Sequence, residues 1–242
     1  MRTPVLLAAA LFLSLGIAAG GYLAGTQVAR MRLADRVVSV KGLAEREVRA
    51  DLAIWPLRFV ATGNDLAEVQ AKTARDEAAV MAFLERHAIP ADAVVSRGLD
   101  VVDLLAQQYR QGPVDSRFIV TRTLTVRTAD VDTVLKASQD MAGLLDQGVV
   151  LGGDTGGGNG PTFAFTRLND IKADMIAEAT KNARASAEQF AADSGARLGG
   201  IRRANQGVFQ ILASNDVPGT FEGREIDKTV RVVSTVDWSL VD

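Results

Sequence analysis

The side chains that could carry chemistry are few, and their spacing does not form a familiar catalytic centre. His87 is the only histidine, and the chain contains no cysteine. A zinc site or a nucleophile–histidine pair needs further residues of these two types. We therefore interpret His87 as a surface residue near the end of a helix. We expect no catalytic residue, no metal site and no cofactor.

The glycine-rich run GGDTGGGNG at residues 152–160 raises the question of phosphate binding. A Walker loop ends in Gly-Lys-Ser/Thr, whereas this run ends in Asn159, Gly160 and Pro161. A dinucleotide-binding loop opens a helix, whereas a strand-like segment follows here. We interpret the run as a mobile hairpin loop, with a loop at an oligomer interface as the alternative.

Carboxylates are plentiful, but their positions indicate helix capping and solvated charge. A calcium loop needs alternating carboxylates, a glycine and a terminal glutamate, and the sequence lacks this pattern. Charged residues make up 23% of the chain and the formal net charge is −2, so no basic surface indicates nucleic acid. The carboxylate pairs are Asp100 and Asp103, Asp130 and Asp132, and Asp170 and Asp174.

The uncharged segment Thr3–Ala29 is long enough to cross a membrane, because about 20 helical residues span a bilayer core. We predict a signal anchor at residues 1–29, a polar linker at 30–36 and one folded domain at 37–242. The alternative is a cleaved signal peptide, with sites near Ala18. Small residues at four-residue spacing indicate a helix-pairing face in the anchor. They are Gly16, Gly20, Gly21 and Gly25.

Residues 37–60 open the folded domain and alternate apolar with polar side chains, the period of a strand with one buried face. The alternation reverses phase at Pro56. A proline cannot donate to a sheet ladder, so we predict a bulge or an edge there. We interpret Ala44-Glu45-Arg46 as a loop tip. Contacts with a neighbouring subunit are predicted at Lys41, Gly42, Trp55 and Pro56.

The later segments predict the element order strand, helix, strand, strand, helix, strand. This is the split βαβ order of a ferredoxin-like sandwich, so we expect an α+β fold. A long helix and further strands should extend it. The helices are expected at 64–86 with Asn64 as cap, from Asp130 onward, and from 169 or 170 to 193 before Gly195. The strands are expected at 93–105, 118–127, 162–165, 197–212 and 228–240.

Four stretches between residues 37 and 240 resemble the SIMPL domain family. They read VSVKGLAEREVRADLAIW, TRTLTVRTADVD, FAFTRLNDIKADMIAEATKNARASAEQFAADSGARLGGI and NQGVFQI. The chain is similar to periplasmic stress-defence and periplasmic immunogenic proteins of Gram-negative bacteria. The resemblance implies an α+β fold, a site outside the cytoplasm and, for some members, ring-like oligomers. It implies no catalytic residues. Many relatives carry a cleaved signal, whereas this N-terminal segment is predicted to be retained.

These observations predict a non-enzymatic, self-associating protein with a role in envelope stress. It would cross the inner membrane once and place its domain in the periplasm; the alternative is secretion to the periplasm after signal cleavage. The alternative function is a ligand-binding or enzymatic module for an unknown small molecule. Such a module would use a pocket lined by aromatic side chains such as Trp55, Phe59 or Phe165.

Overall fold

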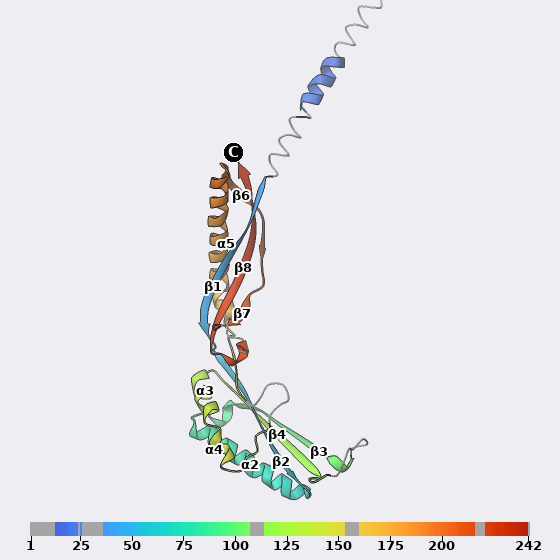
Figure 1. Ribbon diagram of the computed structural model, residues 1–242, viewed down its shortest axis with the longest axis vertical. Helices are drawn as coiled ribbons and strands as arrows, with labels where there is room; N and C mark the ends of the chain where they lie inside the picture. Colours follow the sequence, from blue (N-terminus) through green and yellow to red (C-terminus); the bar gives the residue numbers. More distant parts are fainter. Residues whose placement is uncertain are drawn as a thin grey trace, which may run out of the picture. The chain divides into compact units, whose positions relative to one another are not determined.

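A computed structural model describes residues 13–23, 25, 36–106, 114–152, 160–215 and 221–241. The chain divides into two compact units (Figure 1). The first unit consists of Met1–Glu45, Lys172–Gln210 and Arg231–Asp242, and the second of Arg46–Ile171 and Ile211–Val230. The described strands form two sheets, and helices accompany both, so the α+β class is confirmed.

The second unit contains the predicted split βαβ arrangement. Its sheet has the strand order β3-β4-β2-β5, and each neighbouring pair is antiparallel. Helix α2 connects β2 to β3, while α3 and α4 connect β4 to β5. The bounds are β2 Leu52–Gly63, α2 Leu66–Arg86, β3 Val94–Asp103, β4 Phe118–Thr128, α3 Val131–Gln139, α4 Ala142–Leu145 and β5 Thr162–Ala164. Short 3₁₀ turns lie at Ala91–Ala93, Leu104–Ala106 and Glu222–Arg224.

The core of the second unit is built on alternate residues of β2. Trp55 and Phe59 have no exposed surface, and both belong to the cluster that includes Phe83 and Leu84 of α2. The rings of Trp55 and Phe83 meet edge to face with their centroids 6.4 Å apart, a favoured aromatic geometry. Burial of every second β2 residue therefore fixes which face of the sheet receives the helices.

Of the two alternatives predicted for Pro56, a bulge and an edge position, the bulge is wrong. Pro56 lies opposite Thr125 in an uninterrupted β2–β4 register. Strand β5 pairs only with Leu52–Ile54, so Pro56 lies beyond the end of β5, where its missing N–H removes no β5 bond. The alternation of buried and exposed residues instead reverses at Ala50 and Asp51, between β1 and β2. The reversal occurs there because the two strands belong to different sheets and face different helices.

The other sheet has the order β1-β8-β6, with β7 also paired to β8, and the first unit holds β6 and most of β1 and β8. The backbone N–H of Leu240 donates to the carbonyl of Arg36, so the end of β8 lies beside the start of β1. The predicted loop tip at residues 44–46 is wrong, because these residues continue β1. The predicted strand 197–212 is interrupted at residues 207–209. The bounds are β1 Val37–Arg49, β6 Arg197–Gln206, β7 Gln210–Ala213 and β8 Asp227–Val241.

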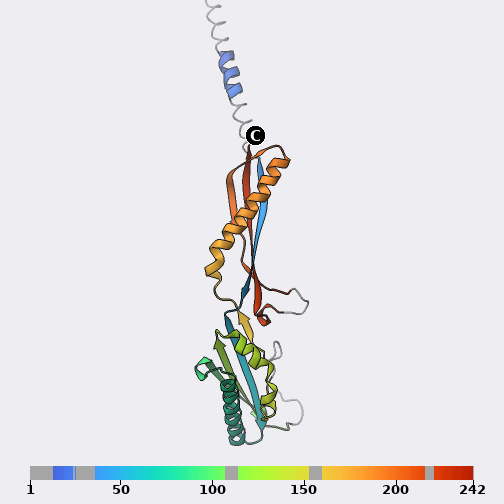
Figure 2. The ribbon, with the colours of Figure 1, turned by 90° about the vertical axis from the view of Figure 1, so that its left-hand side faces the viewer.

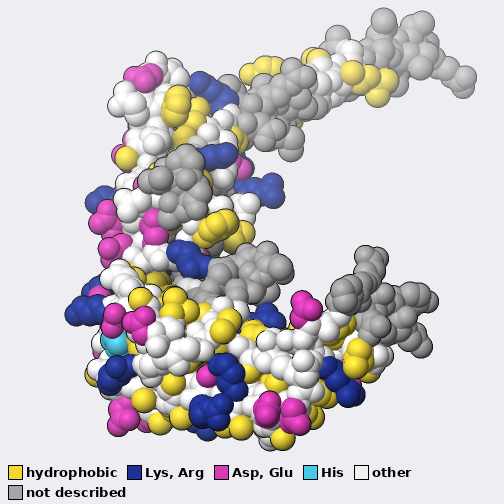
Figure 3. All heavy atoms as spheres, turned by 60° about the horizontal axis from the view of Figure 1, so that its bottom comes forward, with side chains coloured by type: hydrophobic (Ala, Val, Ile, Leu, Met, Phe, Trp, Pro, Cys, Tyr) yellow, Lys and Arg dark blue, Asp and Glu magenta, His cyan; other side chains and the backbone are white. Residues whose placement is uncertain are grey.

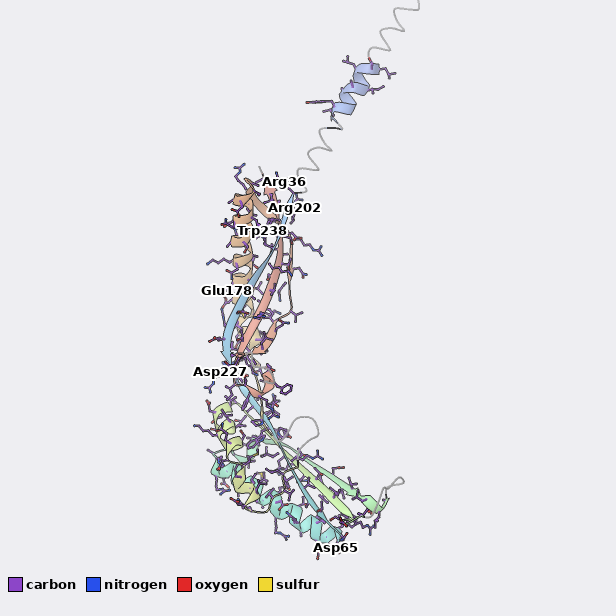
Figure 4. The ribbon with its side chains drawn as sticks, viewed as in Figure 1. Arg36, Asp65, Glu178, Arg202, Asp227 and Trp238 are labelled. Carbon is purple, nitrogen blue, oxygen red and sulfur yellow. The ribbon has the colours of Figure 1, made fainter. Side chains whose placement is uncertain are left out.

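Helix α5 (Leu168–Asp193) lies along one face of this sheet (Figure 2). Its buried stripe is mostly alanine, which allows the helix to approach the strands closely. A Cβ atom placed on Gly42 would lie 1.8 Å from the carbonyl oxygen of Ala179, so only glycine fits beneath the helix. Trp238 of β8 packs in the same layer (Figure 4). Phe190 of α5 lies outside this stripe and is 59% exposed. The stripe is Met175, Ala179, Ala183, Ala187 and Ala191.

The ends of the helices follow local capping rules. The carboxylate of Asp65, rather than the predicted Asn64, accepts hydrogen bonds from the backbone N–H groups of Ala67 and Glu68 at the start of α2 (Figure 4). Asp130 caps α3 as predicted, and its carboxylate accepts from the N–H of Thr133. Gly195, after α5, has the positive φ of 67° expected at a helix C-terminus.

Residues 13–23 of the N-terminal segment are helical. Within the described residues, no helix has both the length and the apolar character needed to span a membrane. Most of the predicted anchor lies outside those residues. Among the described residues, a Cβ atom placed on Gly16, Gly20, Gly21 or Gly25 would have no atom within 4 Å, and the proposed pairing face stays a prediction.

Candidate functional site

The four residues predicted to contact a neighbouring subunit fall into two groups. Lys41 and Pro56 are exposed, whereas Gly42 packs beneath α5 and Trp55 lies in the core of the second unit. Lys41 and Pro56 therefore offer surface to a partner, and Gly42 and Trp55 serve the packing of their own units. The contacts themselves stay a prediction.

Lys41 lies on a sheet face that α5 does not cover. Alternate β1 side chains point away from the helix, and among them Val37 and Leu43 are each 44% exposed. Arg231 of β8 and Glu45 of β1 form an ion pair on this face. We call Val37, Lys41, Leu43, Glu45 and Arg231 the open face. It combines exposed apolar side chains with charged side chains, and protein interfaces contain both kinds.

Strand β1 is also an edge strand. It stands last in the order β1-β8-β6, and no described strand pairs with its outer side. An unpaired edge exposes main-chain N–H and C=O groups that can pair with another strand. The unpaired sheet edge and the open face therefore both belong to strand β1.

The second unit has a groove between α2 and the outer part of its sheet. Its volume is about 360 Å³. The apolar wall includes Leu99 and Val101 of β3, which are 59% and 48% exposed. Val101 lies opposite Val120 and Leu99 opposite Arg122, so all four side chains share the face that α2 partly covers. The lining residues are Leu66, Gln70, Thr73, Ala74, Glu77, Leu99, Val101, Val120 and Arg122.

Charged groups gather at one end of this groove. The guanidinium Nη2 of Arg122 lies 2.8 Å from the carboxylate of Glu77, and the Nε of Arg97 lies 3.9 Å from the same carboxylate. The Nε of Arg122 is buried and has no hydrogen-bond partner among the described residues. One carboxylate thus faces two guanidinium groups, and one buried donor is left over. Sequence reasoning missed this cluster because its members come from three separate elements.

A polar recess surrounds Asp51. Its carboxylate accepts hydrogen bonds from the backbone N–H and the hydroxyl of Thr166, both at 2.9 Å, and from the Nε of Arg167 at 3.1 Å. Burial raises the pKa of Asp51, but the hydrogen bonds from Thr166 and Arg167 outweigh it, so the pKa of this carboxyl is lowered. Arg49 and Asp132 form an ion pair in the same recess. The Asp51 carboxylate is satisfied by Thr166 and Arg167, and Arg49 is paired with Asp132. We therefore interpret the recess as a structural contact between segments of the chain rather than as a ligand site.

His87 is the C-cap of α2 and is half-buried. Its Nδ1 lies 2.9 Å from the carbonyl oxygen of Phe83, and its Nε2 lies 3.0 Å from the carboxylate of Asp140. Both partners are hydrogen-bond acceptors. The arrangement links α2 to the end of α3, which is a structural contact rather than a nucleophile–base pair.

The remaining candidates from the sequence are a metal site, the glycine-rich run and a pocket lined by aromatic side chains. In the described part of the chain, no group of three His, Cys, Asp or Glu side chains could hold a metal ion. Residues 153–159 of the glycine-rich run lie outside the described residues. Trp55 and Phe59 have no exposed surface, while Phe165 is half-buried. Lys and Arg are interspersed with Asp and Glu on the face shown in Figure 3.

The SIMPL family model, described as a protein of unknown function (DUF541), matches residues 38–238. The match covers most of the chain, so the chain belongs to the SIMPL family, and the predicted resemblance is confirmed. No curated protein matches the chain. The family assignment identifies the kind of domain and leaves its activity open.

Proposed function

We propose that this SIMPL protein is a non-catalytic association protein of the cell envelope, and that copies associate through the open face of β1. The observation that carries the proposal is the exposure of Val37 and Leu43 around Lys41, on a sheet face that α5 leaves uncovered. Exposed apolar side chains with a charged rim are typical of association surfaces.

The sheet edge supports the same proposal. Strands β1 and β6 are the two ends of the order β1-β8-β6, and their outer sides are unpaired within the described residues. Two different edges that pair between copies make a heterologous contact, which closes into a ring or continues as a chain of subunits. Self-association through this sheet is therefore geometrically available to identical copies.

The cellular setting is part of the proposal. The uncharged segment Thr3–Ala29 supports a single-pass anchor in the inner membrane, with residues 37–242 in the periplasm. A role in envelope stress is proposed from the resemblance to periplasmic stress-defence proteins. On this account the protein acts by holding copies together at the membrane surface.

The test compares three chains that begin at Ala34. The unmodified chain should have the mass of several protomers by light scattering at micromolar concentrations. Leu43→Asp should shift the mass towards one protomer, because it replaces one of the two apolar side chains of the open face with a charged one. Phe190→Asp is the matched control, since Phe190 is exposed on α5, and it should leave the mass unchanged. A monomeric unmodified chain, or equal effects of the two substitutions, would contradict the proposal.

A further inference from the structure

The groove between α2 and β3 has an apolar end and a cationic end. Leu66 lies at the start of α2 and Glu77 lies 11 residues later, about 16 Å along the helix at 1.5 Å per residue. Along the strands, the pair Val101–Val120 is followed by the pair Leu99–Arg122. The apolar residues therefore begin at one end, and Glu77 and Arg122 stand together at the other.

The cationic end carries a surplus positive charge. Arg122 and Arg97 share the single carboxylate of Glu77, so the cluster keeps one net positive charge. The Arg122 side chain lines the groove and is partly exposed, with a relative exposure of 19%. A guanidinium group forms strong charge-assisted hydrogen bonds with a carboxylate, so this end of the groove favours an anionic group.

We propose that this groove binds a single-chain amphiphile with a carboxylate head, the chemistry of a free fatty acid. The carboxylate pairs with the guanidinium group of Arg122, and the alkyl chain lies over Leu99, Val101 and Leu66. The groove volume, about 360 Å³, lies at the small end of the range of ligand sites. This site lies in the second unit, and its existence does not depend on self-association.

A second copy or an extended peptide fits the observations less well. A strand added to the sheet would pair with the outer side of β3, the end strand of the order β3-β4-β2-β5. Arg122 stands on the inner strand β4, facing α2, so an added strand would not reach its guanidinium group. A ligand inside the groove pairs with this group and covers Leu99 and Val101 together.

The experiment uses the full chain in phosphatidylcholine nanodiscs and a dodecanoate that carries a photoreactive diazirine in its tail. After illumination, mass spectrometry of peptides locates the label. We expect label on residues 66–77 of α2 and 99–101 of β3. Unlabelled dodecanoate should compete, while dodecyltrimethylammonium, which has the same tail and a cationic head, should compete at least tenfold less well. Within a series of alkyl carboxylates, competition should strengthen about two- to fourfold per added methylene until the groove is full.

Variants at the cationic end make the test specific. Arg122→Gln should reduce labelling at least fivefold, and Arg122→Lys should reduce it less, because a positive charge is retained. Arg127→Gln is the matched control, since Arg127 is an exposed arginine of the same strand outside the groove, and it should label like the unmodified chain. Circular dichroism of each variant confirms that the fold is retained.

Three outcomes would overturn the proposal. Label spread evenly over the chain would show partition into the lipid alone. Equal competition by the cationic amphiphile would remove the role of Arg122. A change in oligomeric mass on Leu99→Asp, without labelling of the groove in the unmodified chain, would identify the groove as a contact between copies.

Discussion

At the scale of single residues, Asp51 is the best-defined polar contact in the second unit. It follows β1 in sequence, yet its carboxylate holds Thr166 and Arg167, more than one hundred residues later. These hydrogen bonds keep the ionised form of Asp51 favoured in the folded state, which is why its pKa is lowered.

Asp51→Asn should lower the free energy of unfolding by about 1–3 kcal/mol at neutral pH, since hydrogen bonds to a charged group are lost. The folded pKa of Asp51 lies below the unfolded value, which is about 3.9. Its contribution is therefore complete above about pH 4 and is lost as the pH falls through the folded pKa. Urea unfolding at several pH values should show the two chains converging in acid.

The control for this comparison is Asp100→Asn, at an exposed carboxyl on β3. It should change the free energy of unfolding by no more than about 0.5 kcal/mol. If Asp51→Asn behaved the same way at neutral pH, the proposed role of the Asp51 hydrogen bonds would be wrong.

At the scale of elements, the contact of α5 with β1 depends on small side chains. Gly42→Ala should lower the free energy of unfolding by about 2–4 kcal/mol, because the added methyl group would overlap the backbone of α5 at Ala179 and Ala183. Thermal or urea unfolding of the chain from Ala34 measures this change.

Gly200→Ala is the matched substitution on β6, where open space surrounds the glycine. It should be nearly neutral. A Gly42→Ala chain as stable as Gly200→Ala would show that α5 does not pack on β1 as described.

The sequence predicted elements best where one physical signal dominated. Clear periodicity and capping residues located α2, α3 and α5, and the alternation of Val230, Val232, Val236 and Trp238 located β8. The boundary between β1 and β2 was missed, because a change of sheet and a bulge both reverse the burial phase. Only long-range pairing, with Pro56 opposite Thr125, distinguishes them.

The candidate sites were harder to predict than the elements. Lys41 is exposed and its predicted contact with a neighbouring subunit stays a prediction, whereas burial of Gly42 and Trp55 depends on helices that lie far away in sequence. The groove required Glu77, Arg97 and Arg122 to meet from α2, β3 and β4. No local sequence spacing indicates that these three residues lie together in the fold, so sequence patterns alone could not have predicted the groove.

At the scale of the whole molecule, we propose separate roles for separate parts of the chain. On this proposal the N-terminal segment holds the protein at the membrane, the open face of the first unit joins copies, and the groove of the second unit binds a ligand. The first two proposed roles depend on each other, because an anchored chain that stays monomeric would not form an assembly.

The most direct test is native mass spectrometry of the intact protein after gentle extraction from membranes. We predict assemblies of several protomers at multiples of the 25.7 kDa chain mass, with residues 1–29 retained in each protomer. Leu43→Asp should release single protomers that still carry this segment. A monomer from the unmodified protein, or chains that begin beyond the segment, would contradict the proposal of an anchored assembly.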